Sequence, residues 1–363
     1  MTGLHGRRVY LDWNATAPLR PEAREAMLVA MDAVGNPASV HSEGRATRAI
    51  VERARGDVAA LVGVEPSELV FTASATESAA LLLSGRAPVH ALATEHDAVA
   101  AWADHTVAVD RAGRADADAV RRLSGLEITL AVQAANSETG VLNAAAPRGE
   151  GAFTLRDVTQ VAGKSALRQE ADATILSAHK LGGPKGCGAL TLTGGVELAP
   201  LIRGGGQEMG RRSGTENVIG IAGFGAAAKA AQRDLEAGVW ERVVALRNIL
   251  EDGLEAAAPE LIFFGREAER LPNTSCFAVP GWRGETQVMQ LDLAGFAVSA
   301  GSACSSGKLR ESRVLRAMGY DETTAASAIR VSLGPTTTEA EIRAFVDCWT
   351  ALYRARGARP KTK

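Results

Sequence analysis

The sequence predicts an α/β fold with a mostly parallel sheet, followed by a smaller α+β unit. Apolar strand-like runs alternate with helical patterns through the first two thirds of the chain, which is the order that builds parallel sheets. Ligands of such sheets bind at the carboxyl ends of the strands. The expected strands cover residues 68–73, 91–96, 128–137, 152–159, 172–180 and 188–194.

Helical patterns complete this first unit. A helix is expected from Ser74 until Gly85 stops it, and two long helices are expected near 215–235 and 238–258. The second long helix places apolar residues on one face at helical spacing. They are Val243, Leu246, Ile249, Leu250 and Leu254.

After Pro259 the pattern changes to shorter strand-like runs and shorter helices, near 285–294 and 312–318. A last helix is expected to begin at Thr338, where Glu341 completes a capping box. We therefore predict a large α/β domain over 15–258 and a small α+β domain formed by 1–14 and 259–363.

Composition limits the classes of partner. The chain has 363 residues and a formal net charge of −2, which argues against binding to nucleic acid or to an anionic membrane. No apolar run reaches membrane-spanning length, and the N-terminus lacks the apolar core of a signal peptide. The four cysteines form no CxxC pair. We expect a reduced, cytoplasmic setting and no resident metal.

Lys180 follows the apolar run DATIL and precedes a glycine-rich segment, and Asp157 ends the strand-like run before it. A pyridoxal phosphate (PLP) enzyme needs such a pair at neighbouring strand ends. The lysine holds the aldehyde as a Schiff base, and the acid keeps the pyridine nitrogen protonated. The alternatives are a solvated strand-end lysine and an aspartate that only caps a helix.

The segment Thr72–Thr76 is a candidate phosphate cup. It joins a strand to a helix with small residues, and a helix N-terminus offers free N–H groups to an anion. Ser74 or Thr76 could equally be a plain N-cap. Ser177, His179 and Thr215 are further candidate donors, although the segment around Thr215 could simply be a flexible glycine loop.

Three segments could surround the cofactor ring. His96 ends an expected strand and could stack on the ring and shuttle protons, or it could be an ordinary loop histidine. Gln160 lies one helical turn after Asp157 and could donate to the phenolic oxygen. Asn136 and Ser137 could reach the same oxygen.

Two further residues suggest substrate chemistry. Cys304 lies among small and polar residues in an expected exposed loop. An exposed thiol on such a loop is a liability unless it reacts. Arg330 lies between Ile329 and Val331, so it needs an anionic partner, either a structural acid or a substrate carboxylate. The remaining cysteines are expected to be small buried hydrophobes. They are Cys187, Cys276 and Cys348.

Taken together, these motifs resemble those of cysteine desulfurases of the NifS/IscS kind, within the class-V aminotransferases. The resemblance runs from YLDWNATAPL at 10–19 to IRVSLG at 329–334. It includes TEHDAV, NSETGV, DVTQVAGK, SAHKLGGPKG, GGGQEMGRRSGTENV and SAGSACSS. It implies the PLP-dependent fold type I, with a mostly parallel seven-stranded sheet in the large domain.

The resemblance also implies roles for individual positions. Lys180 would bear PLP, Asp157 would pair with the ring nitrogen and His96 would stack on the ring. The phenolic oxygen would be bonded by Gln160, with Asn136 or Ser137 in support. The substrate would be bound by Arg330 and Asn14. In a homodimer, Thr215 would donate to the phosphate of the partner subunit's cofactor. The phosphate donors within one subunit would be Ala75, Thr76, Ser177 and His179.

The activity implied is the conversion of L-cysteine to L-alanine. Cys304 would attack the sulfur and become a persulfide, which passes sulfur to an acceptor or scaffold protein for iron–sulfur cluster assembly or tRNA thiolation. No metal site is implied, except that Cys304 could transiently ligate an iron–sulfur cluster. The resemblance implies no nucleic-acid or membrane partner.

Two departures from the family pattern leave alternatives open. Ser137 stands where the family commonly has asparagine, and the connection between Val141 and Asp157 is short and contains Pro147 and two glycines. The family normally has a crossover helix there, so we expect an irregular connection. The alternative functions are a different class-V PLP lyase or aminotransferase, in which Cys304 is dispensable, and a PLP-binding paralogue whose activity has decayed.

Overall fold

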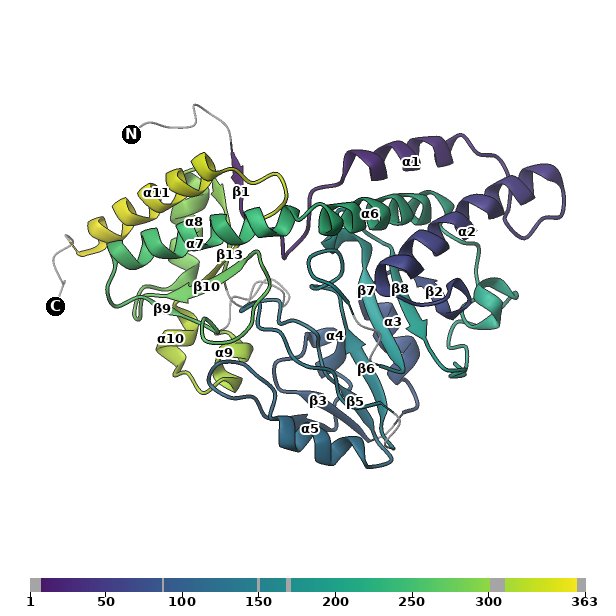
Figure 1. Ribbon diagram of the computed structural model, residues 1–363, viewed down its shortest axis with the longest axis horizontal. Coiled ribbons are helices and arrows are strands. Elements are labelled where there is room, and N and C mark those ends of the chain that lie inside the picture. Colours follow the sequence, from purple (N-terminus) through teal and green to yellow (C-terminus); the bar gives the residue numbers. More distant parts are fainter. Residues whose placement is uncertain (1–7, 87, 149–150, 168–170, 301–310, 358–363) are drawn as a thin grey trace.

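A seven-stranded sheet forms the centre of the larger part of the molecule (Figure 1). The computed structural model describes residues 8–86, 88–148, 151–167, 171–300 and 311–357. All neighbouring strands are parallel except at β8, which runs antiparallel to both of its neighbours. The strand order is β2 (Leu69–Thr72), β8 (Gly188–Leu192), β7 (Ala173–Ser177), β6 (Phe153–Asp157), β5 (Thr129–Ala131), β3 (Val89–Leu92) and β4 (His105–Val107). The predicted mostly parallel α/β sheet is confirmed.

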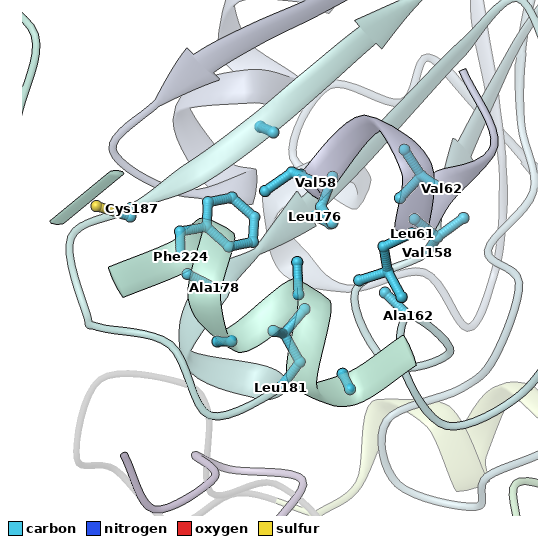
Figure 2. Close-up of a cluster of buried hydrophobic side chains, with 14 of the residues drawn as sticks. Val58, Leu61, Val62, Val158, Ala162, Leu176, Ala178, Leu181, Cys187 and Phe224 are labelled. Atoms are coloured by element: carbon cyan, nitrogen blue, oxygen red, sulfur yellow. The ribbon is translucent and has the colours of Figure 1, made fainter. Parts of the chain in front are cut away.

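Helices cover both faces of this sheet, because successive side chains of a strand point to opposite faces. Leu176 of β7 packs with Val58 and Phe224 in one cluster (Figure 2). Its neighbour Ile175 belongs to a second cluster. The first face is covered by α2 (Ser42–Val62) and α6 (Val218–Glu236), with α1 (Pro21–Met31) packed on α6, and the second face by α3 (Ala75–Leu83).

The helices α2 and α6 approach closely where both have small residues. A Cβ atom on Gly225 of α6 would lie 2.5 Å from the Cα atom of Ala54 in α2. Glycine at this position therefore sets the distance between the two helices that shield the first face.

The C-terminal part builds a separate apolar cluster around a four-stranded sheet. Its strand order is β12 (Ser299–Ala300), β13 (Ala328–Ser332), β10 (Thr274–Ala278) and β9 (Ile262–Phe263). The surrounding helices are α7 (Val239–Ala257), α8 (Gly284–Leu293), α9 (Arg313–Ala317), α10 (Glu322–Ala326) and α11 (Glu339–Gly357). The predicted capping box is present, because the Thr338 amide donates to Glu341 and the Glu341 amide donates to the Thr338 hydroxyl.

The N-terminal segment joins the two parts. Strand β1 (Val9–Tyr10) pairs with β11 (Phe296–Ala297), and the chain then crosses toward the large sheet. Helix α7 packs with α11 in the C-terminal cluster, as Figure 1 shows. The predicted division at residue 258 stays a prediction, and the packing of α7 favours a boundary near Gly238.

All six expected strands end earlier in the structure than predicted, and the difference is largest for two of them. Strand β3 begins at Val89 and ends at Leu92, and β5 ends at Ala131. The residues beyond form loops tied together by polar contacts, since the Thr94 carbonyl accepts hydrogen bonds from the side chains of Gln133 and Asn136. His96 therefore begins the short helix α4 (Asp97–Ala100) instead of ending a strand.

The connection between β5 and β6 is irregular, as predicted. Its described residues, 132–148 and 151–152, contain no helix, while α5 (Ala117–Ser124) precedes β5. Ala146 and Ala152 from this connection are buried in a cluster with Val120 of α5 and Leu130 of β5. These small side chains cover the sheet there, so the parallel register of β5 and β6 is kept.

Among the described residues, no helix is both long and apolar enough to cross a lipid bilayer.

Two glycine-to-alanine changes should have opposite effects on stability. Gly225→Ala should lower the free energy of unfolding by about 1–3 kcal/mol, because its Cβ would collide with α2. Gly56→Ala, in α2, meets no atom within 4 Å and should raise it by about 0.5–1 kcal/mol. Urea unfolding of both variants measures this difference. Equal effects would contradict the close packing of α2 on α6.

Candidate active site

An anion-binding arrangement lies where β2 and β7 end. Ser74 caps α3 by accepting a hydrogen bond from the Glu77 amide at 3.1 Å. The Ala75 amide donates to the Ser177 hydroxyl at 2.8 Å, so the helix N-terminus and the end of β7 are in direct contact. The N-cap interpretation holds for Ser74, while Thr76 is exposed in the first turn of the helix.

Lys180 lies at the end of the short 3₁₀ helix η2 (Ala178–Lys180), directly after β7. It is half-buried, and its Nζ donates to the carbonyl oxygens of Asn14 at 2.7 Å and Ala15 at 2.9 Å. The interpretation as a solvated surface lysine is therefore wrong. Its amine is directed at the N-terminal segment that crosses the site.

Asp157 ends β6, the parallel neighbour of β7. One carboxylate oxygen accepts from the Thr159 amide at 2.8 Å, but the residues that follow form turns, so Asp157 does not cap a helix. His96 is exposed, and its Nδ1 accepts from the Ala98 amide at 3.1 Å as the N-cap of α4. These local contacts hold both side chains at the carboxyl ends of the strands.

Asn14 is completely buried and binds groups from both parts of the protein. Its carbonyl oxygen accepts from Lys180 and from Gln160 Nε2, the latter at 3.0 Å. Its side-chain oxygen accepts from Lys164 Nζ at 3.3 Å and from the Asn273 amide at 3.1 Å. Its Nδ2 donates to Thr274 Oγ1 and to the Ser137 carbonyl. The predicted role of Asn14 in binding substrate stays a prediction, because these contacts already use its amide.

Asn136 and Ser137 have different surroundings. The Asn136 Nδ2 donates to the Thr94 carbonyl, and its Oδ1 accepts from the amides of Glu138 and Thr139. This side chain therefore stabilises its own turn. Ser137 is half-buried and remains the better placed of the two to bond a ligand.

Arg330 lies on β13 and is 3% exposed. It donates from Nη2 to Asp12 Oδ1 at 2.7 Å and from Nη1 to the Ser137 carbonyl at 2.9 Å. The structural ion pair considered for Arg330 is thus present, with an acid that the sequence analysis missed. The contact spans more than 300 positions, so no local pattern could identify it.

His179 lies beside Lys180, and its Nδ1 is 3.2 Å from the Thr16 hydroxyl. Burial, together with the nearby charges of Lys180 and Lys185, lowers the pKa of His179 to about 4. The imidazole is therefore neutral at pH 7, where it can donate a hydrogen bond but adds no positive charge.

Lys164 was missed by the sequence analysis, although it ends the motif that contains Asp157 and Gln160. It is 5% exposed, and its Nζ donates to Gln160 Oε1 at 2.9 Å. Burial lowers the pKa of Lys164 to about 7, and the nearby charges of Lys180 and Arg330 act in the same direction. The spacing of four residues from Gln160 was the available signal.

Two acids near the site were also missed. Burial raises the pKa of Glu95 well above its ordinary value, with the negative charge of Asp157 as the next cause. Burial likewise raises the pKa of Glu138 to about 7, although a hydrogen bond from Ser312 and the charges of Arg330 and Arg313 act to lower it. Both acids lie beside predicted site residues, so the negative charge around the site is smaller than the sequence suggests.

The remaining predicted residues lie apart from this group. Cys304 lies outside the described residues. Cys187 and Cys276 are buried, as expected, and Cys348 is half-buried, with burial raising the pKa of all three thiols. Thr215 is exposed and lines a small pocket of about 100 Å³ with Thr72 and Ala73, next to the candidate phosphate cup.

The pKa of Lys164 predicts a specific pH dependence of stability. Between pH 7 and the ordinary lysine value of 10.5, the unfolded chain binds one more proton at this position than the native chain. The free energy of unfolding therefore rises with pH over that window, by up to about 1.4 kcal/mol per pH unit from this group. Lys164→Met should remove this contribution in urea unfolding measured from pH 7 to pH 10.

The matched control is Lys229→Met, which removes an exposed lysine on α6. The same pH dependence in wild type and Lys164→Met would contradict the lowered pKa of Lys164.

Comparisons with known proteins place this site in a family. The aminotransferase class-V model matches residues 9–345. A cysteine desulfurase of Cereibacter sphaeroides is 42% identical over 363 residues, which covers 92% of this chain and 93% of the relative. Cysteine desulfurases of this family are PLP-dependent enzymes.

Solved structures agree with the sequence match. A NifS-like protein superposes with a TM-score of 0.86 at 32% identity, covering 96% of this chain and 100% of that protein. The structure of SspA in complex with cysteine has a TM-score of 0.74 at 25% identity, covering 91% of this chain and 100% of that protein. From its sequence and its fold, the chain belongs to the class-V aminotransferase family.

Proposed function

We propose that this protein is a PLP-dependent cysteine desulfurase that converts L-cysteine to L-alanine and leaves the sulfur on Cys304. The carrying observation is that Lys180 follows β7, Asp157 ends the neighbouring parallel strand β6, and the N-terminus of α3 bonds the end of β7 through Ser177. The cysteine desulfurase of Cereibacter sphaeroides, which matches nearly the whole chain, supports the same activity.

The described donors fit PLP. The Ala75 amide and the Ser177 hydroxyl already bond each other at the start of α3, where the helix dipole favours a phosphate. Thr76 belongs to the same first turn, and the neutral imidazole of His179 can donate nearby. We assign the phosphate to these four residues.

Lys180 and Asp157 would hold the other end of the cofactor. When bound, PLP supplies an electron sink that accepts the electron pair from the amino acid's α-carbon. Lys180 would hold its aldehyde covalently, and Asp157 would keep its ring nitrogen protonated. His96, at the loop that follows β3, would stack on the ring and move protons. Gln160 and Ser137 would bond the phenolic oxygen, while Asn136 supports their loop.

The substrate carboxylate would bind at Arg330. Its guanidinium is held by the Asp12 carboxylate and the Ser137 carbonyl, so its plane is set before a ligand arrives. Burial strengthens the attraction of this cation for an anionic group. Asn14 contributes by fixing the Ser137 carbonyl, and we keep its direct contact with substrate as a proposal.

Cys304 would carry out the sulfur transfer. Its thiolate would attack the sulfur of L-cysteine, so that a sulfur–sulfur bond forms and the carbon–sulfur bond breaks. The carbon would keep the electron pair of the broken bond and take up a proton, which gives L-alanine and a Cys304 persulfide. The described residues on both sides of this segment are anchored beside the site. Ser299 donates to Asp12 at 2.8 Å, and Ser312 donates to Glu138.

The persulfide would pass its sulfur to an acceptor or scaffold protein, for iron–sulfur cluster assembly or tRNA thiolation. We further propose a homodimer in which Thr215 of each subunit reaches the phosphate of the other. The exposed position of Thr215 next to the phosphate cup of its own chain is compatible with such an interface.

Cys304→Ala should separate this proposal from the other class-V activities. With PLP loaded to the wild-type level, the variant should release alanine from L-cysteine at least about 100-fold more slowly, since the thiol that attacks the sulfur is removed. Alanine and sulfide are measured together, and the visible absorption band reports loading. Cys348→Ala, on α11, is the control.

An unchanged rate in Cys304→Ala would contradict the persulfide step and favour another lyase or aminotransferase activity. A wild-type protein that binds PLP but shows no turnover would favour the decayed paralogue, for which Ser137 and the helix-free connection are the structural grounds.

Arg330→Lys should raise KM for L-cysteine by about tenfold or more and change kcat less. The lysine keeps the positive charge beside Asp12 but loses the planar pair of donors that binds a carboxylate in two places. Steady-state kinetics, with PLP loading measured in parallel, tests this. An unchanged KM would show that the substrate carboxylate binds elsewhere.

A further inference from the structure

Lys164 is a buried cation whose recorded partners are two amide oxygens. Its Nζ donates to Gln160 Oε1 at 2.9 Å and to Asn14 Oδ1 at 3.3 Å, and the residue is 5% exposed. Burying an ammonium group is costly unless an acid compensates it. Here Lys180 and Arg330 add to the cost, since both lower the pKa of Lys164. Below the ordinary lysine pKa, this buried charge lowers the free energy of unfolding.

The contacts of Lys164 determine which way the Gln160 amide faces. The two ends of a glutamine amide have nearly the same shape, but one end accepts hydrogen bonds and the other donates them. In its protonated form Lys164 can only donate, so it selects the Oε1 end. The Nε2 end is then directed to the Asn14 carbonyl, the same oxygen that accepts from Lys180.

Lys164 acts on Asn14 in the same way. The Asn14 Oδ1 accepts from Lys164 and from Asn273, so its Nδ2 faces Thr274 and the Ser137 carbonyl. The Ser137 carbonyl in turn accepts from Arg330. One buried amine therefore bonds two amides that are linked to Lys180 and Arg330, and it helps to orient both.

We propose that Lys164 is a positioning residue that holds the donor end of the Gln160 amide on the Lys180 side of Asn14, where it would bond the phenolic oxygen of PLP. This inference rests on the proposed function and adds to it a residue that acts through Gln160. Nε2 carries two hydrogens, so it can donate to Asn14 and to a ligand together. Lys164 adds a donor at Oε1 to the acceptor that the Asn14 carbonyl provides at Nε2, so both contacts select the same orientation of the amide.

A double-mutant cycle separates this role from a simple effect of charge on Lys180. The variants are Lys164→Met, Gln160→Ala and the pair, with the exposed Lys229→Met as control. Methionine keeps the length of the lysine side chain and removes its donor. The readouts are the PLP dissociation constant and the midpoint of the pH titration of the visible band in the holoenzyme.

Lys164→Met should weaken PLP binding about three- to tenfold, the effect of losing one oriented hydrogen bond. In the Gln160→Ala background, Lys164→Met should change the PLP dissociation constant by less than about twofold, because the amide that Lys164 orients is absent. A full effect of Lys164→Met in that background would overturn the proposal and favour a direct charge effect. No effect in either background would also overturn it.

Urea unfolding of the apoproteins tests the same contact without the cofactor. The effects of Lys164→Met and Gln160→Ala on the free energy of unfolding should be non-additive, and additive effects would overturn the proposal. If the wild type takes up no PLP, the proposed function is wrong. The apoprotein cycle then still tests whether Lys164 and Gln160 interact. If Lys164→Met does not fold, Lys164→Leu, which also removes the donor, replaces it in both cycles with the same expected and opposing outcomes.

Discussion

The hydrogen bonds of the buried Asn14 are the constraint on which the rest of the site depends. Its carbonyl accepts from Lys180 and Gln160, on the large-sheet side. Its side chain and amide bond Thr274 and Ser332, on strands of the smaller sheet. A single residue of the N-terminal segment thus connects both parts where they face each other, and its burial makes each of these bonds costly to lose.

The charges around this residue suit anionic ligands. Lys180, Arg330 and Lys164 lie within electrostatic reach of one another, and Asp12 pairs with Arg330. Burial disfavours the charged forms of Glu95 and Glu138, so these acids offset less of the positive charge than their number suggests. A site with excess positive charge and reduced solvation is suited to bind a phosphate and an amino-acid carboxylate together.

The connection between β5 and β6 shows how a parallel pair can keep its register without a crossover helix. Ala146 and Ala152 fill the space against α5 and the sheet, so the strands remain covered. The turn that follows β5 is held instead by Asn136, whose side chain bonds three backbone groups across two loops. The helix is therefore dispensable for placing Ser137 beside the Arg330 strand.

Local patterns in the sequence determined the strand–helix order and the capping box at Thr338. They also determined the positions of Lys180 and Asp157 at strand ends. These features depend on residues that are near neighbours in the chain. The length of β3 and the burial of Lys180 were beyond such patterns. Only the tertiary structure joined Asp12 to Arg330 and Lys164 to Asn14. Those bonds link positions far apart in the chain, and they form only when packing of the two apolar clusters brings the N-terminal segment across the end of the sheet.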